Sequence, residues 1–543
     1  PQPRHGVEAR PPIWREGFFH AVHLLQSPAA LQAWRRRQGA APLHFVPTMG
    51  ALHQGHQQLL RRAAQPTAAG VPRVLLSVFV NPLQFGPDED FDRYPRTLAA
   101  DAELAAAAGA HALFAPAVGD LYPDGAAGLT RVCPPASLQD ALCGRSRPGH
   151  FDGVATVVCR LLALVRPDRL LLGEKDWQQL VILRRVVADL GLPVLVQGCA
   201  TVRDDDGLAC SSRNRYLAAA ERQQALALPR ALEAAARQVA AGERQAASLV
   251  AGVRDALAQA GLGIDYVELR EAHTLRPLPQ LTGLAVLAAA VHCGPSRLID
   301  HRVLMSRSPI VAVDGPAGAG KSTVTRALAR RLGLLYLDTG AMYRAVTWWL
   351  QQQPLALTDA DAVAAALPAL TLELEAAADG EPRVRVNGQD VSAAIRSPEV
   401  TAQVSTVAAH GCVRELLTRQ QQALGERGGL VAEGRDIGTA VFPDAECKVF
   451  LTATVAERAR RRALDLAQRG FAVPPLAELE AQIAERDRQD SSRAVAPLCQ
   501  AADASELVTD GLAIEAVIEA LVALFRQRVP EEAWPLPDAP LSP

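Results

Sequence analysis

Lysine is almost absent from this sequence. Of its 56 basic residues 53 are arginines, and lysine stands only at positions 175, 321 and 448. Codon bias toward arginine and alanine explains the deficit as a whole. A lysine that persists in such a chain is nevertheless expected where a compact ammonium group is chemically required. Lys175 and Lys321 fall inside motifs and are candidate functional residues, whereas Lys448 stands at an expected strand start without a catalytic motif and is interpreted as structural.

Other absences exclude whole classes of protein. The longest apolar stretches, residues 104–118 and 284–293, are shorter than the roughly 20 residues of a membrane-spanning helix. The 56 basic and 58 acidic residues give a formal charge of −2, so no general attraction to nucleic acid or a membrane surface is expected. The nine cysteines form no C-x-x-C pair, which favours reduced thiols and a cytoplasmic protein. We expect neither a nucleic-acid nor a membrane partner.

The chain of 543 residues is too long for one hydrophobic core. Short β-type runs, such as residues 43–46 and 170–172, alternate with helical segments such as 97–108, a rhythm typical of a parallel sheet covered by helices. A new apolar strand at 309–313 predicts a second α/β unit.

The two ends of the chain differ in composition from the rest. Residues 1–17 are rich in proline and lack the apolar core of a signal peptide, so they predict a flexible extension. Residues 529–543 contain five prolines and two adjacent glutamates, which predict a disordered tail without a role in catalysis.

The strand at 310–313 leads into a phosphate-binding loop. The pattern G-x4-G-K-[ST] is formed by Gly315, Pro316, Ala317, Gly318, Ala319, Gly320, Lys321 and Ser322. Its glycines let backbone N–H groups point at phosphate oxygens, Lys321 reaches the β- and γ-phosphates, and Ser322 can ligate Mg²⁺ that arrives with ATP. A chance glycine turn is the weaker alternative, because a strand precedes and a helical pattern follows the motif.

Residues 307–528 resemble the bacterial cytidylate kinase family, a P-loop nucleoside monophosphate kinase fold. The resemblance rests on the segments 337–344 (LDTGAMYR), 433–439 (EGRDIGT) and 485–498 (ERDRQDSSRAVAPL). Glu433 stands where the family has Asp, and Gln489 where it usually has Arg. The resemblance implies phosphorylation of CMP or dCMP by ATP, with Arg458, Arg460, Arg461 and Arg462 in a lid over ATP and Arg462 as an ATP contact. It also implies that CMP is bound by Thr339, Arg344, Arg414, Arg435, Asp436, Arg486, Asp490 and Arg493. The arginine run 458–462 has an ordinary alternative as a solvated helix face.

The strand at 43–46 leads into a second motif. His53 and His56 belong to an H-x-G-H pattern at an expected helix start, and residues three apart share a helix face. Imidazoles placed there can hydrogen-bond ATP phosphates and offset the charge on departing pyrophosphate. A metal pair or two core histidines would be the alternative.

Residues 18–303 resemble the pantothenate synthetase family. The resemblance rests on the segments 47–56 (PTMGALHQGH), 79–86 (FVNPLQFG), 94–97 (YPRT), 146–151 (SRPGHF), 173–179 (GEKDWQQ) and 210–214 (CSSRN), with Cys210 in place of the usual Leu. It implies condensation of pantoate with β-alanine through pantoyl adenylate, and a homodimer through this half of the chain. Catalytic roles are implied for His56 as proton donor and for His53, Lys175 and Arg213, beside Lys321 in the kinase. Pantoate and β-alanine would contact Gln84 and Gln179. ATP would contact Met49, Gly50, Ala51, Leu52, His53, Gln54, Gly55, His56, Gly173, Glu174, Lys175, Asp176, Val202, Cys210, Ser211, Ser212 and Arg213.

The sequence thus predicts an α/β protein of two enzymes. A Rossmann-like H-x-G-H nucleotidyltransferase-type domain at 18–200 and a smaller closing subdomain at 201–304 precede the kinase domain at 305–528. One alternative keeps both folds and changes the substrates. Another is a scaffold that has lost one activity, which the presence of both histidines and of Lys175 and Lys321 disfavours.

Overall fold

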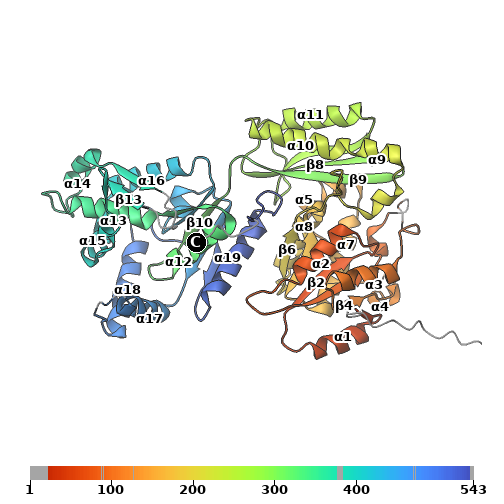
Figure 1. Ribbon diagram of the computed structural model, residues 1–543, viewed down its shortest axis with the longest axis horizontal. Coiled ribbons are helices and arrows are strands. Elements are labelled where there is room, and N and C mark those ends of the chain that lie inside the picture. Colours follow the sequence, from red (N-terminus) through yellow and green to blue (C-terminus); the bar gives the residue numbers. More distant parts are fainter. Residues whose placement is uncertain are drawn as a thin grey trace, which may run out of the picture.

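A computed structural model of the protein describes residues 22–537, apart from residues 87, 88, 90, 126, 127, 376–382, 469, 471 and 494. Its parallel sheets divide these residues into a first half, residues 22–305, and a second half, residues 310–537 (Figure 1). The predicted extension at 1–17 lies outside the described residues. None of the helices described is both long and apolar enough to cross a membrane.

The larger unit of the first half is a six-stranded parallel sheet in the order β1-β4-β3-β2-β5-β6. From β2 the order runs through β3 and β4 to β1 on one side and through β5 to β6 on the other, so it reverses between β2 and β5. Ligands of open parallel sheets bind beyond the carboxyl ends of the strands at such a reversal. The strands and helices of this unit are β1 (His23–Leu25), α1 (Pro28–Arg37), β2 (Leu43–Thr48), α2 (Gln54–Ala63), β3 (Arg73–Val78), α3 (Leu98–Ala107), β4 (Ala112–Phe114), α4 (Val118–Leu121), α5 (Ala136–Gln139), α6 (Leu142–Ser146), α7 (His150–Val165), β5 (Arg169–Gly173), α8 (Trp177–Asp189) and β6 (Leu195–Cys199).

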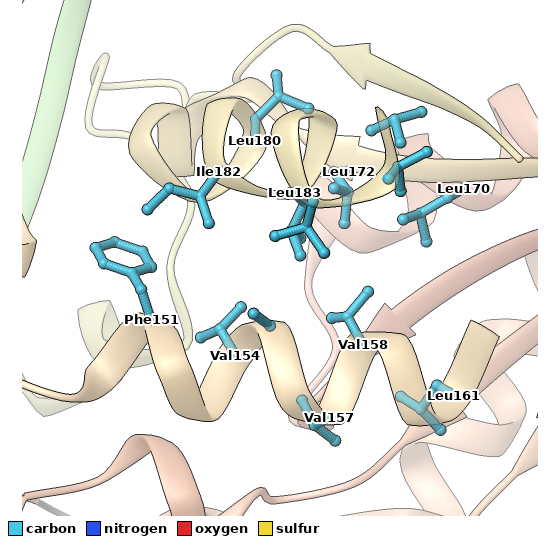
Figure 2. Packing of buried hydrophobic residues seen from close by; sticks show 14 of the residues in the cluster. Phe151, Val154, Val157, Val158, Leu161, Leu170, Leu172, Leu180, Ile182 and Leu183 are labelled. Carbon is cyan, nitrogen blue, oxygen red and sulfur yellow. The ribbon is translucent and has the colours of Figure 1, made fainter. Parts of the chain in front are cut away.

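Helices α7 and α8 close the core on one side of this sheet. Phe151, Val154 and Val158 of α7 point toward Ile182 and Leu183 of α8, and all five side chains are buried (Figure 2). Their spacing of three and four residues along α7 produces one apolar stripe. Each such side chain contributes about 1.5–3 kcal/mol by leaving water, so the stripe fixes α7 and α8 at the ends of β2 and β5.

The smaller unit of the first half follows β6 and lies above the sheet in Figure 1. It was expected to be rich in helix, but it also contains a three-stranded antiparallel sheet in the order β7-β8-β9. The apolar stretch at 284–293 forms β8, the central strand, and nearly all of its side chains are buried because helices cover the sheet. The elements are α9 (Ala219–Ala225), α10 (Ala227–Ala240), α11 (Ala246–Gln259), β7 (Gly263–Glu271), β8 (Leu284–Cys293) and β9 (Ser296–Met305).

The second half contains a five-stranded parallel sheet in the order β11-β15-β10-β16-β17. Its first strand, β10, lies in the centre and ends at the phosphate-binding loop, while β12, β13 and β14 form a small antiparallel sheet beside it. The elements are β10 (Ile310–Asp314), α12 (Lys321–Leu332), β11 (Leu335–Asp338), α13 (Thr339–Leu350), α14 (Ala360–Ala366), β12 (Leu372–Glu375), β13 (Arg383–Val386), β14 (Gln389–Asp390), α15 (Pro398–Ala408), α16 (Gly411–Leu424), β15 (Leu430–Gly434), β16 (Cys447–Thr452), α17 (Val455–Gln468), α18 (Leu476–Ser491), β17 (Ser505–Val508) and α19 (Ile514–Arg528).

The prediction of disorder from residue 529 onward is wrong for residues 529–537. Val529 is fully buried, Trp534 donates its Nε1–H to Leu332 O at 2.7 Å, and Arg526 donates to Trp534 O at 2.6 Å. The prolines do end helix α19, but the segment after them is ordered by contacts with distant parts of the chain. Residues 538–543 lie outside the described residues.

Candidate active sites

The loop that joins β2 to α2 is pinned by a carboxylate from another helix. Asp101 of α3 is buried and accepts the backbone N–H groups of Ala51 at 3.1 Å and Leu52 at 2.8 Å. Gly50 precedes them with a φ of +85°, and a side chain there would meet Val78 and Asp101 within 3.0 Å. The glycine and Asp101 together fix the start of α2 at the sheet's carboxyl edge.

Backbone N–H groups at the start of α2 orient both histidine rings of the motif. His53 Nδ1 accepts the backbone N–H of Gly55 at 3.2 Å, and His56 Nδ1 accepts the backbone N–H of His53 at 3.3 Å. A neutral imidazole that accepts through Nδ1 carries its proton on Nε2. Burial and the charge of Lys175 lower the pKa of His53 to about 4, and burial and His53 lower that of His56 to about 3. Both rings are therefore neutral Nε2–H donors at neutral pH.

These histidines line a cleft of about 330 Å³ at the ends of β2 and β5. Lys175 and Asp176, which follow β5, lie in the same wall, with Lys175 Nζ 3.7 Å from the Asp176 carboxylate. Burial on its own raises the pKa of Asp176, but the charges of Lys175 and Arg213 outweigh it and hold that pKa below its ordinary value. The wall thus combines two neutral donors with one cation that suits phosphate.

The opposite end of the cleft holds amide side chains. Gln84 and Gln179 both line it, and Gln84 accepts from Asn81 Nδ2 at 3.1 Å. The backbone carbonyl of Gln84 in turn lies 2.8 Å from His150 Nδ1 and 3.2 Å from Arg147, which donates to it. Asn81, Arg147 and His150 occur in the sequence motifs, yet no local pattern singled them out as members of the site.

The segment 210–213 lies where the chain enters the smaller unit, and it closes the cleft. Cys210, Ser211, Ser212 and Arg213 line it together with Val202. Asp204 shapes this segment, since it accepts from the Cys210 thiol at 2.9 Å and from Asn214 at 3.3 Å. The buried Cys210 therefore serves the loop's conformation, in the position where the pantothenate synthetase family has leucine.

Some predicted ATP contacts do not line the cleft. The predicted residues that do line it are Met49, His53, Gly55, His56, Gln84, Gly173, Lys175, Asp176, Gln179, Val202, Cys210, Ser211, Ser212 and Arg213, whereas Gly50, Ala51, Leu52, Gln54 and Glu174 are not among the lining residues. The backbone N–H groups of Ala51 and Leu52 donate to the carboxylate of Asp101. The carboxylate of Glu174 is buried and accepts backbone N–H groups of Glu531 and Glu532 instead.

The second site forms around the phosphate-binding loop after β10. Gly315 lies where a side chain would be 2.0 Å from Leu451 O, so only glycine fits. Lys321 is buried and donates to the carbonyls of Gly315 at 2.7 Å and Pro316 at 2.9 Å. Burial and the charge of Arg435 lower the pKa of Lys321 to about 7. A phosphate group would restore its charge.

The glutamate at position 433 bridges the loop and its neighbours. Glu433 Oε1 accepts from Ser322 Oγ at 2.6 Å and from the Tyr336 hydroxyl at 2.8 Å, and its backbone carbonyl accepts from Thr339 at 2.6 Å. Burial and Asp338 raise the pKa of Glu433. Within the described part of the chain, its buried Oε2 has no hydrogen-bond partner.

The arginines that were assigned to the acceptor nucleotide lie near this glutamate. Arg435 donates to Asp490 at 3.0 Å, and Arg493 also pairs with Asp490. Arg414 pairs with Asp436, and Arg344 pairs with Asp338 at 3.0 Å. Burial and the charge of Arg435 lower the pKa of Arg486 to about 10, which places Arg486 beside the same group. An excess of cations around two buried carboxylates suits a dianionic phosphate.

Arg462 of α17 was predicted to lie in a lid over ATP, and that role stays a prediction. It pairs with Asp465 at 3.1 Å on an exposed face of α17. Arg458 and Arg461 reach the loop, donating to Ala317 O at 3.1 Å and Ala319 O at 3.2 Å. Residues three apart share a helix face, whereas one further residue turns the side chain by about 100° toward solvent.

Comparisons with known proteins match each half separately and the chain as a whole. The family model described as pantoate-beta-alanine ligase matches residues 22–303, and that described as cytidylate kinase matches residues 311–527. A bifunctional pantoate ligase/cytidylate kinase of Prochlorococcus marinus (strain MIT 9313) is 65% identical over 93% of this chain and 99% of its own length. One of Parasynechococcus marenigrum (strain WH8102) is 62% identical over 95% of this chain and 100% of its own length. A pantothenate synthetase structure from Thermus thermophilus is 44% identical, with a TM-score of 0.48, and covers 52% of this chain and 98% of that chain.

Proposed function

The chain belongs to the family of bifunctional pantoate ligase/cytidylate kinases, and from this premise we propose which residues perform each reaction. The first half is the pantoate ligase and the second half is the cytidylate kinase. The assignment of the individual residues rests on the geometry of the two sites.

The ligase reaction runs in two steps in this proposal. A carboxylate oxygen of pantoate attacks the α-phosphorus of ATP, so that pyrophosphate leaves and pantoyl adenylate forms. The amine of β-alanine then attacks the acyl carbon, loses one proton, and displaces AMP, which keeps the carboxylate oxygen. Because water would hydrolyse the adenylate, residues 210–213 close over it in the cleft.

The interlocked pair His53 and His56 is the observation that carries this proposal. Both rings offer an Nε2–H to the cleft because both Nδ1 atoms accept backbone N–H groups. Such fixed donors stabilise the negative charge that develops on the phosphates without rearrangement. With a pKa of about 3, His56 acts as a neutral hydrogen-bond donor rather than as an imidazolium. Lys175 adds the positive charge, and Gln84 and Gln179 bind pantoate and β-alanine.

The oxygen balance provides the test of the two steps. With pantoate labelled by ¹⁸O in its carboxylate, we expect one labelled oxygen in the AMP that accompanies pantothenate. Label in inorganic phosphate instead would indicate an acyl phosphate, and unlabelled AMP would indicate that the carboxylate never attacked the α-phosphorus.

The kinase site transfers the γ-phosphoryl group of ATP to CMP or dCMP. Lys321 and the loop N–H groups neutralise the donor phosphates, while Arg344, Arg435, Arg486 and Arg493 bind the acceptor phosphate. Phosphoryl transfer needs little covalent help, so placement of charge is the main contribution of these residues. Asp490 holds Arg435 and Arg493 in position, while Thr339, Arg414, Asp436 and Asp490 are further proposed contacts of CMP.

The residues around Ser322 fit Mg²⁺ that arrives with ATP. Ser322 Oγ lies beside Glu433, whose buried Oε2 lacks a partner among the described residues. Magnesium prefers such oxygen ligands and takes the remainder from phosphates and water. When bound, the ion neutralises the negative charge that builds between the β- and γ-phosphates.

Further assignments remain part of the proposal. The domain boundaries are 18–200, 201–304 and 305–528, and the gap between β9 and β10 supports the last of them. All nine cysteines are free, which supports a cytoplasmic location. Resemblance implies a homodimer through the first half, which sedimentation of the full chain would test.

A further inference from the structure

The end of the second half lies against the first half. We name residues 529–534 the C-terminal strap; they follow helix α19, which lies between the two halves in Figure 1. Trp534 ties the strap to Leu332 of α12, while Ala533 packs against the hydrophobic cores of both halves. Arg184 of α8 donates to the carbonyls of Arg526 and Gln527 at 3.3 Å just before it. The strap is therefore held by contacts with both halves of the chain.

The backbone of the strap binds the glutamate of the loop after β5. The N–H groups of Glu531 and Glu532 donate to the two carboxylate oxygens of Glu174, at 2.9 Å and 3.1 Å. Only 1% of Glu174 is exposed, and Gly198 of β6 leaves the space for its carboxylate. A buried carboxylate that loses its donors is costly, so these bonds fix the backbone between Gly173 and Lys175.

The side chains of the strap reach three further parts of the ligase. Glu532 accepts the backbone N–H of Thr201 at 2.8 Å and lies 3.2 Å from His301 Nε2 on β9. Thr201 is in the connection between the large sheet and the smaller unit. Glu531 pairs with Arg62, on the helix that carries both catalytic histidines, at 3.1 Å. One short segment thus contacts α2, the loop after β5, the interdomain connection and β9.

We propose that Glu531 and Glu532 are positioning residues for the ligase reaction, supplied by the kinase half, which set the loop of Lys175 and the connection to the closing unit. The inference rests on the proposed role of that loop in ATP binding. It makes ligase catalysis dependent on the last ordered residues of the kinase half, although neither glutamate lines the cleft. Among the described residues, the side-chain contacts of Glu531 and Glu532 are with the first half, and none is with the phosphate-binding loop of the kinase.

The test uses full-length variants and scores both products. Alanine keeps the backbone N–H groups that bind Glu174 but removes the side-chain contacts that hold the strap at Arg62, Thr201 and His301. Glu532→Ala and Glu531→Ala are therefore expected to let the strap shift and to raise the KM for ATP in the ligase reaction about tenfold, because displacement of catalytic groups by a fraction of an ångström is costly. The KM for β-alanine and the rate of CDP formation should stay unchanged. Glu532→Gln, which retains an acceptor for Thr201 but loses the charge opposite His301, should fall between Glu532→Ala and the wild type.

Glu519→Ala is the matched control. Glu519 of α19 also joins the halves, since it accepts the N–H of Ala68 at 2.8 Å, but it does so away from the cleft. An unchanged ligase KM for ATP in the Glu531 and Glu532 variants would overturn the proposal. So would an equal loss in Glu519→Ala, since any weakened junction would then explain the effect.

The same variants distinguish two further outcomes. If Glu532→Ala also loses CDP formation, the substitution has damaged the fold. The test then depends on Glu532→Gln, and wild-type ligase kinetics in Glu532→Gln would contradict the proposal. If the wild type itself makes no pantothenate while it makes CDP, the proposed function fails, and with it the premise of the inference.

Discussion

His53 donates its backbone N–H to Nδ1 of His56 at 3.3 Å, so the first histidine of the motif fixes the tautomer of the second. The ring centroids lie 4.1 Å apart, and His53 itself is fixed by the N–H of Gly55. The geometry explains why the histidines occur three residues apart at a helix start. Free N–H groups of the first turn orient the rings that face the substrate.

His56→Ala should lower the ligase kcat about 100-fold, because it removes one fixed donor to the phosphates. CDP formation by the same protein should be unchanged. His292→Ala, at an exposed position of β8, is the matched control and should leave both rates intact. Equal ligase rates in the two variants would contradict the role of His56.

The low pKa values of His53 and His56 predict that neither ring titrates between about pH 5 and pH 8. NMR of the imidazole Cε1–H signals should show two pH-independent resonances that vanish singly in His53→Ala and His56→Ala. Their movement with a midpoint near 6.5 would contradict the burial described.

The same shifts have a consequence for stability. In the unfolded chain both imidazoles become protonated below about pH 6.5. In the folded protein His53 and His56 stay neutral until the pH approaches their pKa values of about 4 and about 3. The unfolded state then binds more protons, so the contribution of this pair to stability falls as the pH drops through that window. Denaturant unfolding of His56→Gln should show a weaker acid dependence than the wild type.

The phosphate-binding lysine should not tolerate arginine. The buried Lys321 donates to the carbonyls of Gly315 and Pro316 through a compact ammonium group, which a planar guanidinium does not reproduce, so Lys321→Arg should slow CDP formation about 100-fold or more. Lys448→Arg is the same substitution in the same half. Lys448 pairs with Asp503 away from the loop, and near-normal CDP formation is expected there. A similar loss in both variants would contradict the assignment.

Nucleotide binding should protonate Lys321. Its pKa is about 7 because of burial and Arg435, and bound phosphates would raise that pKa. Above this pH a proton is therefore taken up on binding. Titration calorimetry with ATP at about pH 8, in two buffers of different ionisation enthalpy, should give different apparent heats for the wild type. The difference should shrink in Lys321→Met; an unchanged difference would assign the proton elsewhere.

Arg461 and Arg462 offer a paired test of the helix that covers the kinase loop. Arg461→Ala should raise the KM for ATP in the kinase reaction several-fold, because Arg461 donates to Ala319 O. Arg462→Ala should have little effect, since its partner is the exposed Asp465 and surface pairs contribute about 0–1 kcal/mol. The reverse result would support the role that the sequence predicted for Arg462.

Local signals in the sequence predicted much of both sites. Glycine turns follow the strands that end at Thr48 and Asp314, and the strand that ends at Gly173 leads directly to Lys175. In each case residues of defined chemistry come immediately after a strand, so the motif and the strand support the same interpretation. Such signals depend only on neighbours along the chain, and the loops around His53 and Lys321 were therefore predictable.

What escaped prediction depends on distant residues. Asp101 binds the turn at Ala51 from a helix 50 residues away, and nothing in its alanine-rich surroundings distinguishes it. The contacts of Arg458 and Arg461 with the loop also escaped prediction, because a run of arginines does not show which helix face meets the loop. The strap around Glu532 resembled a disordered tail because it has no core of its own; its order comes from contacts with residues 174, 201 and 301.

The central claim is that one chain carries two working sites, each with its own catalytic residues. The most direct measurement follows pantothenate with AMP, and CDP with ADP, for the wild type, His56→Ala and Lys321→Arg under identical conditions with ATP and Mg²⁺. The account predicts both product pairs from the wild type, normal CDP formation with about 100-fold slower pantothenate formation from His56→Ala, and normal pantothenate formation with at least about 100-fold slower CDP formation from Lys321→Arg. Loss of both products in either variant, or a missing product in the wild type, would contradict it.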